Sequence, residues 1–86
     1  MAEKLKPEKA NKAYQALGAQ IRALRKKRGW SQEELAHHAG VHVTYLSGLE
    51  RGHRNPSLNI IVQLASALKV TPSELLKKLD AGFLRK

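Results

Sequence analysis

Residues 31–52 of this chain of 86 residues read SQEELAHHAGVHVTYLSGLERG and contain the signals for two short helices joined by a turn. Ser31 opens this stretch with a hydroxyl that can accept a hydrogen bond from a free helix amide, and Glu34 follows at the spacing of a capping box. Gly40 supplies a residue that tolerates the unusual backbone dihedrals of a tight turn. The pattern predicts a short helix from Ser31, with Leu35 facing inward, and a turn at Gly40.

A second short helix is predicted after the turn, from His42 or Val43 to about Arg51, with Gly52 closing it. The apolar residues that anchor this helix from one side are Val41, Leu46 and Leu49. Small Ala36 lets the two helices approach, and two short helices that cross steeply need a turn with a glycine. The opposite face of the second helix is therefore free to enter a groove. It carries Val43, Thr44, Ser47, Gly48 and Arg51.

The residues before this stretch predict one long amphipathic helix. From Pro7 to Arg28 nearly all residues are good helix formers, and a proline is tolerated in a first turn. The apolar residues at i, i+4 and i+7 on this helix are Leu17, Ile21 and Leu24. Gly29 follows a basic last turn, which is typical of a helix end. Residues 1–6 are expected to form a flexible basic leader.

Two further helices are predicted after residue 52. Ser57 is the expected cap of the fourth helix. The apolar stripe of that helix consists of Leu58, Ile61, Leu64, Ala65 and Leu68. A cap, an N1 proline and an N3 glutamate begin a fifth helix at Thr71, Pro72 and Glu74. This helix is expected to run to about Asp80, and since no stretch predicts a strand, residues 7–86 are expected to form a single all-α domain, a compact five-helix bundle.

Composition limits the possible classes of function. The chain has no cysteine, which excludes a disulfide scaffold and a thiolate zinc site. No apolar run reaches the roughly 20 residues of a membrane span and no signal-peptide pattern opens the chain, so the cytoplasm is the expected location. The net charge is +9, and residues 1–28 carry nine Lys and Arg against two Glu. This basic excess favours a polyanionic partner.

Several motifs are informative together: Ile21-Arg22-x-Leu24-Arg25, Gly29-Trp30-Ser31-Gln32-Glu33-Glu34-Leu35-Ala36, Tyr45-Leu46-Ser47-Gly48-Leu49-Glu50-Arg51-Gly52, Asn55-Pro56-Ser57-Leu58 and Leu64-Ala65-x-Ala67-Leu68. With them the chain resembles the Cro/cI-type helix-turn-helix family, also called the XRE family, from about Leu17 to Leu79. Within that family, residues 44–51 followed by Arg54-Asn55 look most like the controller proteins of restriction-modification systems. The resemblance implies a bundle of the lambda-repressor-like DNA-binding type, in which helices two and three form the helix-turn-helix.

The resemblance also implies roles for individual residues. Contacts to base edges are implied for Val43, Thr44, Ser47 and Arg54. Contacts to the DNA backbone are implied for Ser31, Gln32, His42, Tyr45, Arg51 and Asn55. The alternatives are a solvent-exposed Gln32, a Tyr45 that covers the edge of the core, and an exposed loop charge at Arg54. Val43 departs from the controller pattern, where a long polar residue is common, because valine can pack on a thymine methyl but cannot make the bidentate guanine contact of an arginine.

Two further roles are structural. Arg25 and Glu50 match the family's partly buried ion pair, which joins the first helix to the end of the third. Removing one partner of a buried pair strands a charge and costs about 3–5 kcal/mol. Trp30 is expected to pack in the core rather than to serve as a platform for base stacking.

A homodimer on a palindromic operator is expected, because one short helix reads few base pairs. Leu76, Leu79 and Phe83 recur at i, i+3 and i+7 near the end of the chain. Ile60 and Val62 add apolar surface to a fourth helix whose core stripe is already complete. We expect these residues to form an interface in which the same patch of two chains meets.

The sequence thus predicts a sequence-specific regulator of transcription that binds double-stranded DNA, and not an enzyme. It has no Gly-rich phosphate loop, no nucleophile with an orienting base and no paired carboxylates in a setting that raises a pKa. The four histidines, which lack acidic or thiol ligands at a useful spacing, are His37, His38, His42 and His53. No metal, cofactor or small-molecule ligand is therefore expected. The alternatives are an antitoxin that also caps a toxin, and an adaptor that bridges proteins and binds nucleic acid nonspecifically.

Overall fold

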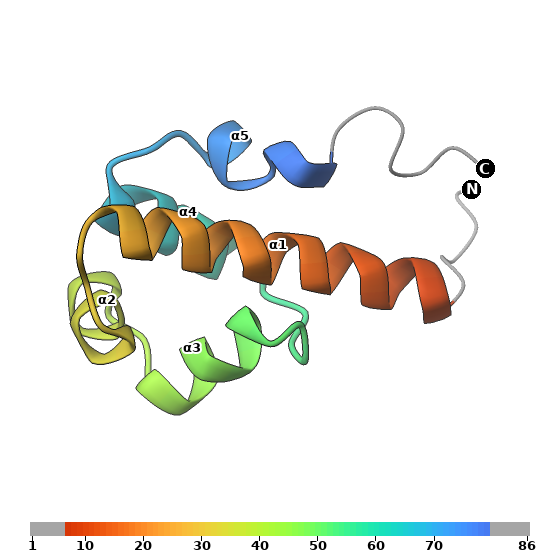
Figure 1. The fold of residues 1–86 in the computed structure, drawn as a ribbon, viewed down its shortest axis with the longest axis horizontal. Helices are drawn as coiled ribbons and strands as arrows, with labels where there is room; N and C mark the ends of the chain where they lie inside the picture. The colour runs from red at the N-terminus through yellow and green to blue at the C-terminus, as the bar shows by residue number, and fades with distance from the viewer. Residues whose placement is uncertain (1–6, 80–86) are drawn as a thin grey trace.

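A computed structural model describes residues 7–79, and within them all regular secondary structure is helical. The elements are α1 (Pro7–Lys27), α2 (Gln32–Ala39), α3 (Val43–Glu50), α4 (Leu58–Leu68), α5 (Pro72–Leu75) and the 3₁₀ turn η1 (Lys77–Leu79). The long α1 crosses the middle of the molecule, with α2 and α3 along one side of it and α5 and η1 along the other (Figure 1). The predicted all-α fold with a helix-turn-helix in α2 and α3 is confirmed.

Local capping explains where α2 begins and ends. The Ser31 hydroxyl accepts a hydrogen bond from the Glu34 amide at 3.0 Å, and the Glu34 carboxylate accepts one from the Ser31 amide at 2.7 Å. This reciprocal pair is the predicted capping box. Gly40 ends the helix in the left-handed region, with φ 73°, a conformation that costs other residues steric strain. The turn that sets α3 across α2 is thus encoded locally.

The later helices use the same chemistry at their first turns. The Ser57 hydroxyl accepts a hydrogen bond from the Ile60 amide at 3.2 Å, and the Thr71 hydroxyl accepts one from the Glu74 amide at 3.1 Å. Pro72 follows Thr71 at the first helical position, where its missing N–H is no loss. Both predicted starts are therefore present.

One core joins the helices. Its buried apolar residues are Leu17, Ile21, Leu35, Ala36, Ala39, Leu46, Leu49, Leu64, Ala65, Leu68 and Leu75. Leu58 was expected in this core, but its side chain is 72% exposed. Leu58 is the first residue of α4, and side chains of a helix tilt toward its N-terminus. At the first position this tilt carries the side chain past the end of the helix and away from the core.

The fifth helix is much shorter than the sequence predicts. We expected it to reach about Asp80, but α5 ends at Leu75 and the chain tightens into η1. The Leu79 amide donates a hydrogen bond to the Leu76 carbonyl at 2.9 Å. A 3₁₀ turn stacks residues i and i+3, so Leu76 and Leu79 lie on one side and are both half-buried. The same apolar spacing that suggested a longer α-helix is satisfied by this tighter turn.

Candidate nucleic-acid interface

The helix α3 is fixed to the rest of the molecule by one face. Leu46 and Leu49 are 0% and 1% exposed, and the Glu50 side chain is 3% exposed. The first two pack in the core with residues of α1 and α2, while Glu50 ends the helix at a polar contact. The orientation of α3 is therefore set from inside, and its other face needs no protein partner.

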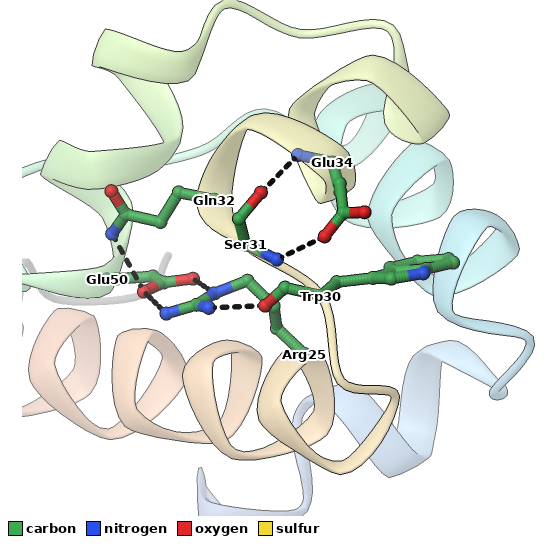
Figure 2. Close-up of polar contacts among 6 residues, drawn as sticks. All are labelled: Arg25, Trp30, Ser31, Gln32, Glu34 and Glu50. Atoms are coloured by element: carbon green, nitrogen blue, oxygen red, sulfur yellow. Dashed lines mark hydrogen bonds and ion pairs between the residues drawn. The ribbon is translucent and has the colours of Figure 1, made fainter.

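The polar contact at the end of α3 joins three elements (Figure 2). Arg25 of α1 donates to both carboxylate oxygens of Glu50, from Nε at 2.7 Å and from Nη2 at 3.0 Å. Its Nη1 donates to the Trp30 carbonyl at 2.7 Å. Gln32, the first residue of α2, donates from Nε2 to Glu50 at 3.0 Å. The fork of the guanidinium thus links α1, the loop before α2, and α3.

The electrostatics of this contact favour the charged pair. The hydrogen bond with Glu50 raises the pKa of the Arg25 guanidinium above its ordinary value, against the opposing effect of burial. Arg25 is 8% exposed, so solvent screens the pair weakly. Bidentate arginine–carboxylate pairs also impose a direction on both side chains. The pair therefore fixes the angle between α1 and α3 as well as adding stability.

The outer face of α3 carries the residues expected to read bases. Val43 is 37% exposed and Thr44 is exposed, whereas Ser47 is half-buried. The hydroxyl of Ser47 accepts a hydrogen bond from Nη1 of Arg51, the residue that caps α3. Three of the four expected base-contacting residues thus lie on α3, and their side chains are small enough to admit a groove edge. The bond between Ser47 and Arg51 was not foreseen, although a spacing of four residues on a helix permits it.

The fourth expected base-contacting residue, Arg54, lies in the loop after α3. Its guanidinium carbon lies 5.7 Å from the centre of the Tyr45 ring, within the range of a cation–π contact. Tyr45 is half-buried and packs against the core, so it covers the core edge and also touches Arg54. Asn55 is exposed beside it. The resemblance implied that Arg54 and Tyr45 lie near DNA, but it did not imply that the two side chains contact each other.

The start of α2 carries the residues expected to hold a phosphate. Ser31 is exposed and is occupied in the capping box, while Gln32 is half-buried. The side-chain amide of Gln32 bonds Glu50, so it is tied to the polar contact at the end of α3. The first amides of a helix have no partner within the helix and suit an anion. His42, at the cap of α3, is exposed and makes no side-chain capping bond.

Basic residues gather on the last part of α1. The exposed ones among residues 22–28 are Arg22, Lys26, Lys27 and Arg28. Arg28 lies over the Trp30 ring at 4.8 Å from its centre, and that ring stacks on His38 at 4.3 Å. Trp30 is half-buried and packs against the core as expected. Among the residues that the structure describes, no cluster of three metal-ligating side chains is present, and no helix is long and apolar enough to cross a bilayer.

The residues expected at a dimer interface lie on α4 and on the segment that follows α5. Ile60 is half-buried beside Tyr45, whereas Val62 is 49% exposed on another side of α4. Leu76 and Leu79 are half-buried and do not belong to one α-helix, because α5 ends at Leu75. Phe83 lies outside the described residues. The predicted continuous fifth helix is therefore wrong, whereas the dimer interface itself stays a prediction.

Comparison with known proteins agrees with this geometry. The sequence profile of the helix-turn-helix family matches residues 21–75. The HTH-type transcriptional regulator y4dJ of Sinorhizobium fredii is 41% identical over 64 residues, which are 74% of this chain and 83% of the relative. The control protein C.BamHI of Bacillus amyloliquefaciens is 45% identical over 60 residues, 69% of this chain and 74% of the relative.

A solved structure extends the likeness to three dimensions. The restriction-modification controller protein C.AhdI from Aeromonas hydrophila has a TM-score of 0.71 and 45% identity, covering 72% of this chain and 94% of that chain. The matched profile runs from Ile21 in α1 to Leu75 in α5, so it includes the whole helix-turn-helix and its supports. The chain therefore belongs to the helix-turn-helix family, together with these transcriptional regulators and controller proteins.

Proposed function

We propose that the chain is a transcriptional regulator that binds double-stranded DNA with sequence specificity, acting in the cytoplasm by placing α3 in the major groove. The observation that carries this proposal is the division of α3 into two faces. Leu46, Leu49 and Glu50 are buried on one face, and Val43 and Thr44 stand exposed on the other. A helix held from behind with a small, exposed outer face is the form in which a helix-turn-helix reads base edges.

The chemistry of the outer face suggests how bases are read. Thr44 and Ser47 can donate or accept a hydrogen bond at a base edge, and Val43 can pack on a thymine methyl. None of the three makes a bidentate contact to guanine. Arginine can, and two exposed arginines lie near this face, Arg51 at the end of α3 and Arg54 in the loop after it. Specificity in this proposal therefore combines few direct contacts with the shape of the DNA.

The backbone contacts orient α3 in the groove. The amides at the start of α2 receive one phosphate, with Ser31 and Gln32 beside it. The other proposed backbone contacts are His42 at the cap of α3, Tyr45 within α3 and Asn55 in the loop after it. The exposed basic residues at the end of α1 add attraction for the DNA polyanion. These contacts supply affinity, whereas the outer face of α3 supplies specificity.

The active species is proposed to be a homodimer on a palindromic operator. Two copies place their α3 helices one helical turn apart, about 34 Å, on one side of the duplex. Val62 offers exposed apolar surface for this contact, and the other residues expected there are the half-buried Ile60, Leu76 and Leu79. Light scattering tests it: Val62→Glu and Leu79→Glu should each give monomers. A dimer that survives both substitutions would contradict this interface.

We further propose that the chain acts as a controller of a restriction-modification system. The similarity to C.BamHI and C.AhdI, each at 45% identity, supports this subclass. Such a regulator needs no ligand, because its own concentration is the signal. Whether occupancy blocks or recruits polymerase then depends on the position of the operator.

Selection of binding sites from a random duplex library at near-physiological salt tests the function directly. The proposal predicts enrichment of one two-fold symmetric site, bound about 10³-fold or more tightly than random DNA. Binding that appears only at low salt, with no enriched site, would contradict it and would favour a nonspecific adaptor. Co-purification with a small toxic protein instead would favour an antitoxin.

A further inference from the structure

Gly48 lies inside α3, where a glycine is unfavourable. In a helix interior glycine costs about 1 kcal/mol relative to alanine. Gly48 has an ordinary helical conformation, so no positive φ requires it. It is nevertheless buried, although Val43 and Thr44 on the outer face of the same helix are exposed. Something other than the backbone of α3 must account for the absence of a side chain.

The side chain of Arg54 occupies the space where a side chain of residue 48 would stand. A Cβ atom on Gly48 would lie 3.1 Å from both Cγ and Nε of Arg54, and 3.7 Å from its Cδ. The two distances of 3.1 Å are tighter than ordinary contact between a methyl group and its neighbours, so the Arg54 side chain would have to shift. The aliphatic stem of Arg54 therefore rests directly on the bare backbone of α3 and covers it.

The end of α3 folds the chain back to make this contact. Gly52 adopts φ 78°, and its amide donates to the Leu49 carbonyl at 3.0 Å. The next amide, that of His53, donates to the Gly48 carbonyl at 2.9 Å. These two bonds, donated by the left-handed Gly52 and by the residue after it, form a Schellman motif. It fixes the loop at the level of Gly48, so Arg54 begins beside the position that it covers.

Tyr45 holds the far end of the same side chain. It precedes Gly48 by three residues, so the two share a face of α3. The Arg54 guanidinium lies over the Tyr45 ring at 5.7 Å. Both parts of the Arg54 side chain are thus held in position. The backbone at Gly48 contacts its aliphatic part, and the Tyr45 ring contacts its guanidinium.

We propose that Gly48 is a positioning residue for DNA binding. Because it has no side chain, Arg54 can lie across α3 and against Tyr45. The guanidinium is then held beside the outer face of α3 before DNA binds. This inference rests on the proposed function, in which Arg54 contacts a base edge. A methyl group at position 48 would stabilise the helix but would displace the Arg54 side chain from its contact with α3. Gly48→Ala should therefore weaken DNA binding without lowering the stability of the protein.

The test is a double-mutant cycle of Gly48→Ala and Arg54→Ala on the operator obtained by site selection. Gly48→Ala alone should leave the melting temperature unchanged or higher and weaken operator binding about tenfold, an effect common for residues in contact. In the Arg54→Ala background the same change should have no effect on affinity. Ser66→Ala is the matched control, because Ser66 is exposed on α4 and its replacement also adds helix propensity.

Equal losses of operator affinity from Gly48→Ala in both backgrounds would overturn the inference, because Gly48 would then act without Arg54. An unchanged affinity of the Gly48→Ala single variant would overturn it as well. A wild-type protein that selects no operator would contradict the proposed function instead. NMR of the free protein then decides about Gly48 separately. The ring current of Tyr45 should shift the Arg54 side-chain resonances, and this shift should disappear in Gly48→Ala but persist in Ser66→Ala. A shift unchanged in Gly48→Ala would overturn the inference.

Discussion

The two faces of α3 differ in what holds their side chains. On the inner face, Leu46 and Leu49 are enclosed by the core and Glu50 accepts three hydrogen bonds from Arg25 and Gln32. On the outer face, Val43 and Thr44 stand exposed. The inner face therefore carries the folding energy of the motif, and the outer face can change without unfolding it. This division lets one scaffold present different recognition surfaces.

The largest effect is expected from Glu50→Ala. It leaves the Arg25 guanidinium buried without its carboxylate and should lower the free energy of unfolding by about 3–5 kcal/mol in chemical denaturation. The control is Glu74→Ala, because Glu74 pairs with Lys77 at 3.4 Å in an exposed position. That change should cost less than about 1 kcal/mol. Similar losses from both variants would show that the pair at Glu50 is no more than a surface contact.

The next prediction compares the loss of stability at two residues of α3 that are three positions apart. Leu46→Ala should cost about 2–5 kcal/mol, because the side chain is fully enclosed and its removal leaves a cavity. Val43→Ala should change stability by less than about 0.5 kcal/mol, because that side chain is partly in solvent. Thermal and chemical unfolding measure both. A destabilisation by Val43→Ala as large as that by Leu46→Ala would break the division between the faces.

A smaller change, in affinity rather than in stability, is expected from Thr44→Ala. Removing a hydroxyl that meets a base edge should weaken binding to the selected operator about tenfold and relax the preference at one base pair. The free energy of unfolding should stay within about 0.5 kcal/mol. Titration of the operator by fluorescence anisotropy measures the affinity, with Ser66→Ala as a control that should bind like the wild type. An unweakened Thr44→Ala variant would remove Thr44 from the reading face.

The smallest effect is expected from Ser31→Ala, at the start of α2. Loss of the cap should cost about 1 kcal/mol. Ser57→Ala is the matched variant, since Ser57 caps α4 in the same way. Both should lower the melting temperature, but Ser31→Ala should also weaken DNA binding, because Ser31 borders the expected phosphate site. Equal operator affinities for the two variants would show that the start of α2 does not touch DNA.

The sequence predicted those parts of the molecule that local chemistry determines. The capping box at Ser31, the glycine turn at Gly40 and the cap at Ser57 each involve residues within a few positions of one another. Such features can be recognised in a sequence because all the partners are adjacent in it. The two faces of α3 were predicted for the same reason, because Leu46 and Leu49 lie three positions apart on one helix.

The rest depends on contacts between distant residues. The bond from Gln32 to Glu50 spans 18 residues, and Arg54 meets Tyr45 only because the loop after α3 turns back. Apolar spacing from Leu75 to Leu79 fits an α-helix as well as the tighter turn that is present, so the sequence could not decide between them. Whether this segment forms an α-helix or a tighter turn depends on the residues that it packs against. These residues are distant in the sequence, so the segment alone does not reveal the outcome.

In the proposed function, the outer face of α3 reads DNA, while the inner face only holds the helix in place. The most direct test is site selection from a random duplex library, with the wild type and with the double variant Thr44→Ala, Ser47→Ala in parallel. The wild type should enrich a two-fold symmetric site. The variant should melt at the same temperature and bind at low salt but enrich no such site. Enrichment of the same site by the variant would contradict the proposed role of the outer face.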